Sequence, residues 1–233
     1  MPAARQGPRV PRRRAAAPDT SAPARQRVLD TALRLFSAQG YNRTGIRAIA
    51  AAAGVNVSAI GYYFGDKAGL YRATLVEPLC EFSTPAQGCT LPDLPLDRAL
   101  AAFMAEFLAP LKLGQTARRV VRLHFREIVE PTTVGSAIVD GAMRPEYTAL
   151  LARLAREFGQ RRPDAGLQVL AFAVLGLAVH FYVAQDRVSD LAPRLLADPA
   201  AIDALARDLA RHACAMIEAE RRRRGVGKQR RQR

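Results

Sequence analysis

The sequence predicts an all-α protein with an N-terminal three-helix helix-turn-helix unit and a larger C-terminal helical domain. Apolar residues recur at helical spacing from Ala24 to about Glu220. No segment alternates apolar and polar residues as a half-buried strand does. Hydrophobic residues make up 49% of the 233-residue chain and charged residues 24%, which is enough for a sizeable core.

The charge of the chain is concentrated at its two ends. Lys and Arg number 35 against 21 Asp and Glu, a net charge of +14. Residues 1–27 carry a net +6 and residues 221–233 a net +8, so the residues between them are neutral. Neither end has a hydrophobic period, and we expect disordered basic tails at residues 1–23 and 221–233. A transit peptide is an alternative for the first tail, but its five prolines disfavour the amphipathic helix that one requires.

Several kinds of protein are disfavoured by what the sequence lacks. The longest apolar segment, Leu167 to Val183, contains His, Gln and Gly, and we interpret it as a buried helix rather than a membrane span. The first residues have no apolar leader, and three cysteines suit a reducing compartment, so we expect a cytoplasmic protein with no membrane partner. Three scattered histidines give no support for a metal site, and we expect no cofactor.

Residues 24–76 show the spacing of a helix-turn-helix domain. A first helix ends at Gly40, Thr44 is placed to cap a second helix that ends at Gly54, and Ser58 is placed to cap a short third helix. Gly65 then breaks the chain and Asp66 begins a fourth helix that runs to about Cys80. A short helix after a compact turn is the element that such domains insert into the DNA major groove.

The stretch TGIRAIAAAAGVNVSAIGYYFGDKAGLY, residues 44–71, closely resembles the TetR family of bacterial transcriptional regulators. The residues that match are Thr44, Arg47, Ile49, Ala50, Gly54, Val55, Tyr63, Phe64, Lys67 and Leu70. The resemblance implies phosphate contacts by Thr44, Tyr63 and Lys67. It assigns base reading to Asn56, Ser58, Ala59 and Tyr62, with Arg47 as an additional contact. Gly61 stands where the family usually has an aromatic residue.

After a Pro-rich hinge loop at residues 77–96, we expect a helical domain over residues 97–220 for effector binding and dimerisation. The strings REIVEPT at 126–132 and MRPEYTALLARL at 143–154 resemble the CecR-like branch of the TetR family, whose regulators respond to small molecules. Candidate effector contacts on inward faces are Phe103, Phe107, His124, Glu127, Met143, Tyr147, Phe172 and His180. The alternative for each aromatic residue is ordinary core packing.

Within that domain we expect helices over 97–111, 115–129, 134–143, 145–158, 164–185, 188–196 and 199–220, with a break between the third and fourth at Pro145. The helix over 164–185 is apolar nearly all round, which predicts burial on all sides. The resemblance implies that it forms an intermolecular four-helix bundle with the last helix.

Together these features predict a homodimeric DNA-binding transcriptional regulator of a palindromic operator, a repressor that a small-molecule effector releases. An enzyme is disfavoured because HExxH, GxSxG and GxGxxG are absent and GVGK at 225–228 is not a P-loop. A non-specific architectural DNA binder that uses the two basic tails is a further alternative. Cys80 and Cys89 flank the Pro-rich loop and could form a redox switch.

Overall fold

The computed structural model describes residues 21–82 and 94–225. Every regular element within these residues is a helix, which confirms the all-α prediction. Residues 1–20 and 226–233, which make up most of the two predicted tails, lie outside the described residues, as does Cys89.

The N-terminal part consists of α1 (Ser21–Gln39), α2 (Ile46–Ala53), α3 (Val57–Phe64) and α4 (Lys67–Phe82). Two predicted boundaries differ from the structure. Residues 21–23 belong to α1 rather than to a disordered tail, and α4 runs to Phe82, close to its expected end near Cys80, so residues 77–82 are not part of the hinge loop. Arg25 ties α1 to α4, because its guanidinium donates to both carboxylate oxygens of Glu77 at 3.0 and 2.6 Å.

The turn between α2 and α3 is built from backbone conformation and one cap. Gly54 ends α2 with φ at 66°, in the left-handed region that favours glycine. The Asn56 side chain caps α3 by accepting a hydrogen bond from the Ser58 backbone N–H at 3.2 Å. We predicted that Ser58 caps α3, and this is wrong. Ser58 lies inside the first turn of α3.

Thr44 is also not a helix cap. Gly45 occupies the N-cap position of α2 without a side-chain hydrogen bond. The Thr44 hydroxyl instead donates to the carbonyl of Gly40 at 2.8 Å, and Thr44 is only 2% exposed. Thr44 thus fixes the turn between α1 and α2 from the inside.

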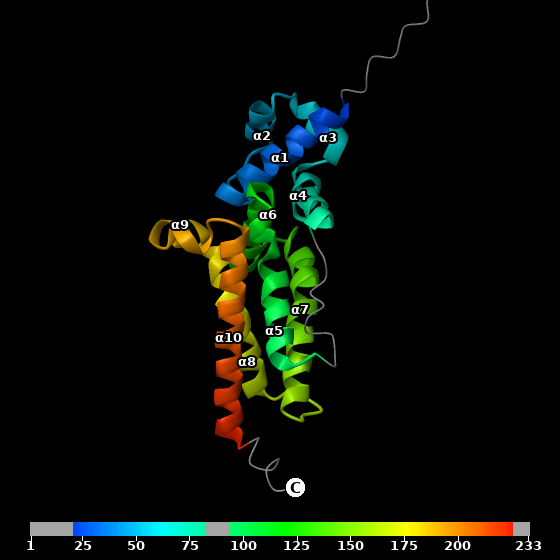
Figure 1. Ribbon diagram of the computed structural model, residues 1–233. Coiled ribbons are helices and arrows are strands. Elements are labelled where there is room, and N and C mark those ends of the chain that lie inside the picture. The colour runs from blue at the N-terminus through cyan, green and yellow to red at the C-terminus, as the bar shows by residue number, and fades with distance from the viewer. Residues whose placement is uncertain (1–20, 83–93, 226–233) are drawn as a thin grey trace, which may run out of the picture.

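The C-terminal part consists of α5 (Leu96–Leu108), a 3₁₀ turn (Ala109–Lys112), α6 (Gln115–Val129), α7 (Ser136–Glu157), α8 (Ala165–Val183), α9 (Gln185–Leu191), a second 3₁₀ turn (Pro193–Leu195) and α10 (Pro199–Arg224). The helices α5, α7, α8 and α10 run along one another as an elongated bundle, with the N-terminal part at one end and α9 projecting to the side (Figure 1).

Two expectations about these helices are wrong. We predicted a break at Arg144–Pro145, but α7 is continuous with Pro145 in its interior. We also placed residues 221–224 in a disordered tail, whereas α10 runs through Arg224 and ends at Gly225. Ion pairs of these last arginines stabilise the additional turn of α10.

The two parts share a core through α6. Val120 and Leu123 of α6 and Val139 of α7 lie in the same buried cluster as Leu33, Phe36, Ile49, Ile60 and Leu75 of the N-terminal part. The N-terminal core is therefore closed by residues of the C-terminal part. Burial of these side chains fixes α1 and α4 on α6.

The apolar helix α8 is buried on one face only. Leu167, Ala171 and Val174 are fully buried in the bundle, but Val169, Phe172 and Val183 are 68%, 64% and 58% exposed. A single chain therefore leaves one face of α8 uncovered, and the prediction that a partner helix covers it stays a prediction. By length and composition this helix is also apolar enough to cross a membrane.

The cap of α3 gives a stability prediction. Replacing Asn56 by alanine leaves an N–H at the start of α3 without its partner, and we expect a loss of about 1 kcal/mol in the free energy of unfolding. Urea denaturation measures it. Ser58→Ala is the matched control, because only the Ser58 backbone takes part in the cap, and an equal loss in both variants would contradict this assignment.

Candidate nucleic-acid interface and its connection to the C-terminal domain

The α3 helix packs on the core through Ile60 and, in part, Phe64, and it is open on its outer face. Ile60 is 1% exposed and lies in the core, whereas Tyr62 is 83% exposed. Ser58 and Gly61 are also exposed, and Ala59 is half-buried. Three of the expected base-reading residues, Asn56, Ser58 and Tyr62, are thus exposed, whereas Ala59 is only partly so. A side chain built at Gly61 would contact nothing, so the open surface there is not required by packing.

Two aromatic residues at the end of α3 differ in their surroundings. The ring of Tyr62 lies edge-on to that of Tyr63 with centroids 5.2 Å apart, and Tyr63 in turn lies 6.3 Å from Phe64. Tyr63 is half-buried, while Tyr62 projects into solvent. Tyr62 is thus free to enter a groove, and Tyr63 is positioned beside it.

Lys67 is the first residue of α4 and is oriented by an aromatic ring. Its ammonium lies 4.3 Å from the centroid of the Tyr41 ring, and partial burial lowers the pKa of Lys67. The Asp66 carboxylate accepts from the Gly69 N–H at 2.7 Å and begins this helix as predicted. A Cβ at Gly69 would lie 2.0 Å from the Phe64 carbonyl oxygen, so glycine permits the close approach of α3 and α4.

The second helix presents Arg47, which is exposed in its first turn. The first N–H groups of any α-helix lack partners within the helix and favour an anion. Because the Thr44 hydroxyl points to the α1 carbonyls, a phosphate at this end would meet backbone N–H groups and Arg47 rather than that hydroxyl.

A polar contact that no sequence pattern predicts joins the two parts of the chain. The Tyr71 hydroxyl of α4 donates to Glu127 Oε1 of α6 at 3.1 Å. The other carboxylate oxygen accepts from the backbone N–H and the hydroxyl of Thr132, each at 3.2 Å. Tyr71 is 1% and Glu127 3% exposed, and burial followed by the Glu127 charge raises the pKa of Tyr71 well above its usual value. We call Tyr71, Glu127 and Thr132 the junction triad.

Arg126 makes a second connection beside the junction triad. Its guanidinium donates to the Ala38 carbonyl at 3.3 Å near the end of α1, and also to Glu130 at 3.0 Å. A Cβ at Gly40 would lie 2.8 Å from the Arg126 Nε, so glycine makes room for this side chain. Two clefts of about 270 Å³ each open beside Arg126, one toward Tyr41 and Arg43 and the other toward Val183 and Asp186.

His124 is a buried polar residue one turn before the junction triad on α6. Its Nδ1 lies 2.9 Å from the Val120 carbonyl, and its Nε2 is buried with no hydrogen-bond partner in the described structure. Burial lowers the pKa of His124. A buried imidazole nitrogen without a partner is costly, and it is a natural contact for a ligand that carries a hydrogen-bond donor.

The other candidate effector residues do not gather round one cavity. Phe103 is fully buried in the bundle core and Phe107 is half-buried, with its ring 5.9 Å from that of Phe103. Met143 packs against both core clusters. Tyr147 stacks on Phe172 at 4.8 Å. Phe172 and His180 are exposed on α8, so the expectation that they face inward is wrong. The two clefts beside Arg126 are lined by other residues.

The cysteines and possible metal ligands carry little chemistry in the described residues. Cys80 belongs to α4, and the proposed pairing with Cys89 lies outside the described residues. Cys214 is half-buried on α10, and burial raises the pKa of its thiol. In residues 21–82 and 94–225, no three His, Cys, Asp or Glu side chains gather as metal ligands would.

Two family profiles match the chain over most of its length. Residues 28–74 match the profile described as "Bacterial regulatory proteins, tetR family". Residues 96–219, more than half of the chain, match the one described as "HTH-type transcriptional dual regulator CecR, C-terminal domain". The chain belongs to the TetR family of transcriptional regulators. Both resemblances in the sequence are thereby confirmed, and TetR-family members are DNA-binding regulators rather than enzymes.

Curated TetR-family proteins match a short part of the chain. The HTH-type transcriptional regulator AcrR of Shigella flexneri is 53% identical over 47 residues, which are 20% of this chain and 22% of that protein. The probable regulator YttP of Bacillus subtilis is 41% identical over 53 residues, 23% of this chain and 26% of that protein. The chain thus matches about a quarter of the length of these relatives.

Solved TetR-family structures share the fold over nearly their whole length. PfmR of Thermus thermophilus superposes with a TM-score of 0.58 at 19% identity, covering 81% of this chain and 94% of that one. NalD of Pseudomonas aeruginosa gives a TM-score of 0.54 at 22% identity, covering 85% and 97%. AibR, solved with isovaleryl coenzyme A and operator DNA, gives 0.53 at 22% identity, covering 73% and 98%.

Lys67 and Tyr62 have different surroundings, and we expect their replacement by alanine to change DNA binding in different ways. Lys67→Ala should weaken binding to all duplexes alike and lower the slope of log affinity against log salt by about 0.9, because a phosphate contact carries no base information. Tyr62→Ala should change which sequences are preferred. Fluorescence anisotropy with several duplexes over a salt series measures both, and the reverse pattern would contradict the assigned roles.

The buried imidazole predicts a pH dependence of stability. Because the pKa of His124 is lowered in the folded state, the unfolded chain takes up this proton first, near its ordinary value of about 6.5. The free energy of unfolding should therefore fall as the pH drops from about 7 to about 5.

His124→Gln should remove this part of the decline in urea denaturation, whereas His212→Gln, a change at an exposed residue of α10, should keep it. An unchanged decline in His124→Gln would show that the pH effect has another source.

Proposed function

We propose that this TetR-family regulator is a homodimeric repressor that binds a palindromic operator and is released by a small-molecule effector. The observation that carries the proposal is the α3 helix, anchored by Ile60 and presenting Tyr62 83% exposed, within the segment that matches the family's DNA-binding domain. The protein would act in the cytoplasm, where a bacterial operator lies.

The surface divides into positioning and reading groups. Lys67 of α4, Tyr63 of α3, and Arg47 with the first backbone N–H groups of α2 suit phosphates, which set orientation but carry no sequence information. The Thr44 hydroxyl, which we expected to contact a phosphate, is instead used inside the turn before α2. Asn56, Ser58, Ala59 and Tyr62 lie on or next to the outward face of α3 and would meet base edges in the major groove. With Gly61 small, Tyr62 is the largest side chain available for base contact.

Dimerisation through α8 and α10 is supported by the exposed apolar face of α8. Val169, Phe172 and Val183 form a stripe at helical spacing that the chain itself does not cover. A second copy would bury this stripe by packing α8 and α10 against their equivalents. A dimer also suits two half-sites about one helical turn apart, roughly 34–36 Å.

Release by an effector would work through a shift of population. The α3 helices of the two protomers must be spaced to fit the two half-sites. A small molecule that binds more tightly to a form in which this spacing is wrong stabilises that form and so lowers the affinity for the operator. His124, with its unpartnered Nε2, is the best supported contact. The other candidates lie on α5, α6 and α7, and they are Phe103, Phe107, Glu127, Met143 and Tyr147. Two structural neighbours support the general scheme, since AibR was solved with a coenzyme A thioester and operator DNA, and NalD is described as a repressor.

Selection from random duplex DNA tests the proposal. The full-length protein should enrich a sequence with two inverted half-sites spaced by one helical turn. Tyr62→Ala should enrich a different sequence. A pool without any preferred sequence would contradict operator recognition and favour non-specific architectural binding.

The dimer has its own test at Phe172. Phe172→Glu places a charge in the proposed interface, and we expect monomers with an unchanged helical content, because this side chain is exposed in the single chain. Sedimentation velocity and circular dichroism measure the two properties. Leu175→Glu would not serve, because Leu175 is 8% exposed and belongs to the core of its own chain.

Phe172→Leu is the matched control and should remain dimeric. Dimers of Phe172→Glu at micromolar concentration would show that this stripe is not the interface.

A further inference from the structure

The positive charge of the chain is divided between two ends of the molecule. Among the described residues, 21–76, which include the DNA-binding domain, carry a net +5. Residues 153–164 and 218–225 together carry a net +4, and the other described residues carry −2. DNA binding through α3 accounts for the first concentration of charge but not for the second.

The second basic region lies at the far end of the bundle from α3. It comprises the end of α7, the loop to α8 and the end of α10, and Figure 1 shows these at the opposite end of the molecule from α1, α2 and α3. The 26 residues of α10 span about 39 Å, so the two regions are well separated.

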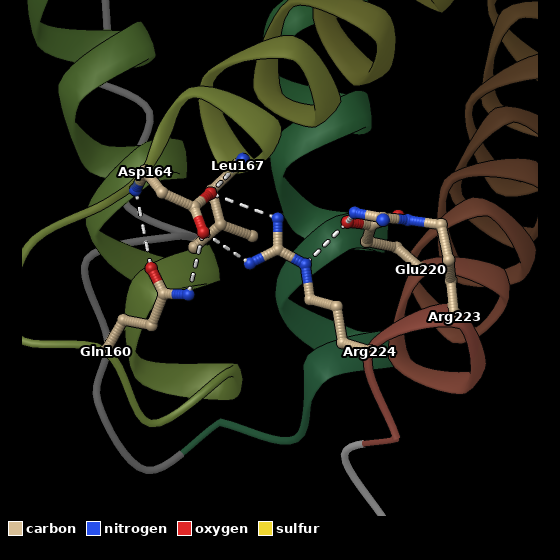
Figure 2. A network of polar contacts seen from close by, with 6 residues as sticks. All are labelled: Gln160, Asp164, Leu167, Glu220, Arg223 and Arg224. Atoms are coloured by element: carbon tan, nitrogen blue, oxygen red, sulfur yellow. Dashed lines mark hydrogen bonds and ion pairs between the residues drawn. The ribbon is translucent and has the colours of Figure 1, made fainter.

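The carboxylates of this region are held in ion pairs with its arginines (Figure 2). The Arg224 guanidinium donates to both oxygens of Asp164 at 2.7 and 3.0 Å, and through Nε to Glu220 at 2.5 Å. Arg223 donates twice to Glu220, at 2.7 and 2.6 Å. These arginines lower the pKa of Glu220 to about 2 and hold the pKa of Asp164 far below its usual range. Both acids are therefore ionised and paired at neutral pH.

The two remaining carboxylates are paired as well. Glu157 lies between Arg153 and Arg221, with its oxygens 2.8 and 2.5 Å from their guanidinium nitrogens, and Glu218 accepts from Arg221 at 2.6 Å. The guanidinium carbons of Arg221 and Arg224 lie 6.0 and 5.3 Å from the centroid of the Phe158 ring. These contacts fix the end of α10 on the end of α7.

Four arginines remain after this pairing. Arg156, Arg161, Arg162 and Arg222 are exposed and have no ion-pair partner among the described residues. We call these four the distal arginines. The region therefore offers unpaired guanidinium groups on a rigid base, with every acid in it already bound to another arginine.

We propose that the distal arginines bind the phosphate backbone of a second DNA duplex, so that the regulator bridges two DNA segments. Guanidinium groups match phosphate oxygens in charge and geometry, and each contact releases counterions. Duplex DNA is the favoured polyanion because α3 already holds the protein on DNA, which raises the local concentration of neighbouring segments. The inference rests on DNA binding by the family and not on release by an effector.

A bridging assay tests the inference with the full-length protein. A duplex of random sequence is fixed to beads and loaded with protein at low salt, and capture of a second, fluorescent duplex is measured. We expect capture by the wild type, and a loss of at least about tenfold when Arg156, Arg161, Arg162 and Arg222 are all changed to Gln, since each lost phosphate contact removes about 0.9 from the salt slope. Loading on the first duplex should stay the same, because α3 and its flanking residues are untouched.

A matched variant controls for the change in total charge. Arg119, Arg144, Arg187 and Arg194 lie outside the distal region, and changing all four to Gln removes the same charge and should preserve capture. Equal capture by the wild type and the distal variant, or equal loss in the matched variant, would overturn the inference. So would binding of the distal arginines to phosphatidylglycerol vesicles without capture of a duplex. Failure of loading itself in the wild type would instead count against DNA binding through α3.

Discussion

The arrangement of the whole protein depends on one helix that belongs to two cores. Val120 and Leu123 of α6 complete the core under α1 and α4, whereas Phe125 of the same helix stacks on Tyr182 of α8 in the bundle. The junction triad adds a directional contact, because the Tyr71 hydroxyl meets a buried carboxylate that Thr132 holds from the other side. Any displacement of α6 therefore has to move α4 with it or break a buried hydrogen bond.

This arrangement gives a physical route from the C-terminal domain to DNA. His124 lies one turn before Glu127 on α6. The positions of α3 and α4 are coupled, because the two helices approach each other closely at Gly69. A ligand that satisfies the Nε2 of His124 acts on the same helix that positions Tyr71. In the proposed homodimer, an effector bound at His124 would thus bias the contacts that set the orientation of α3 in each protomer.

Local sequence patterns were enough for the fold and the outer face of α3, but not for contacts between distant residues. Helical spacing located the helix-turn-helix, and the bounds of α6 were predicted to the residue. Ser58 and Asn56 are both good caps at adjacent candidate sites, and only the turn after Gly54 selects Asn56. Pro145 did not break α7, because packing on α8 outweighs one lost backbone hydrogen bond. Tyr71 and Glu127 are 56 residues apart, and no periodicity predicts their hydrogen bond.

The central claim is that the junction triad holds the DNA-binding domain on α6. In a chain whose three cysteines are replaced by alanine, a spin label is attached through Asp30→Cys, at an exposed position of α1. Pulsed electron resonance then reports the distance between the two DNA-binding domains of the proposed dimer. We expect one narrow distance distribution for the otherwise unchanged protein and a broader one for Tyr71→Phe, which keeps the ring packing but removes the hydroxyl. Distributions of equal width in the two proteins would contradict the claim.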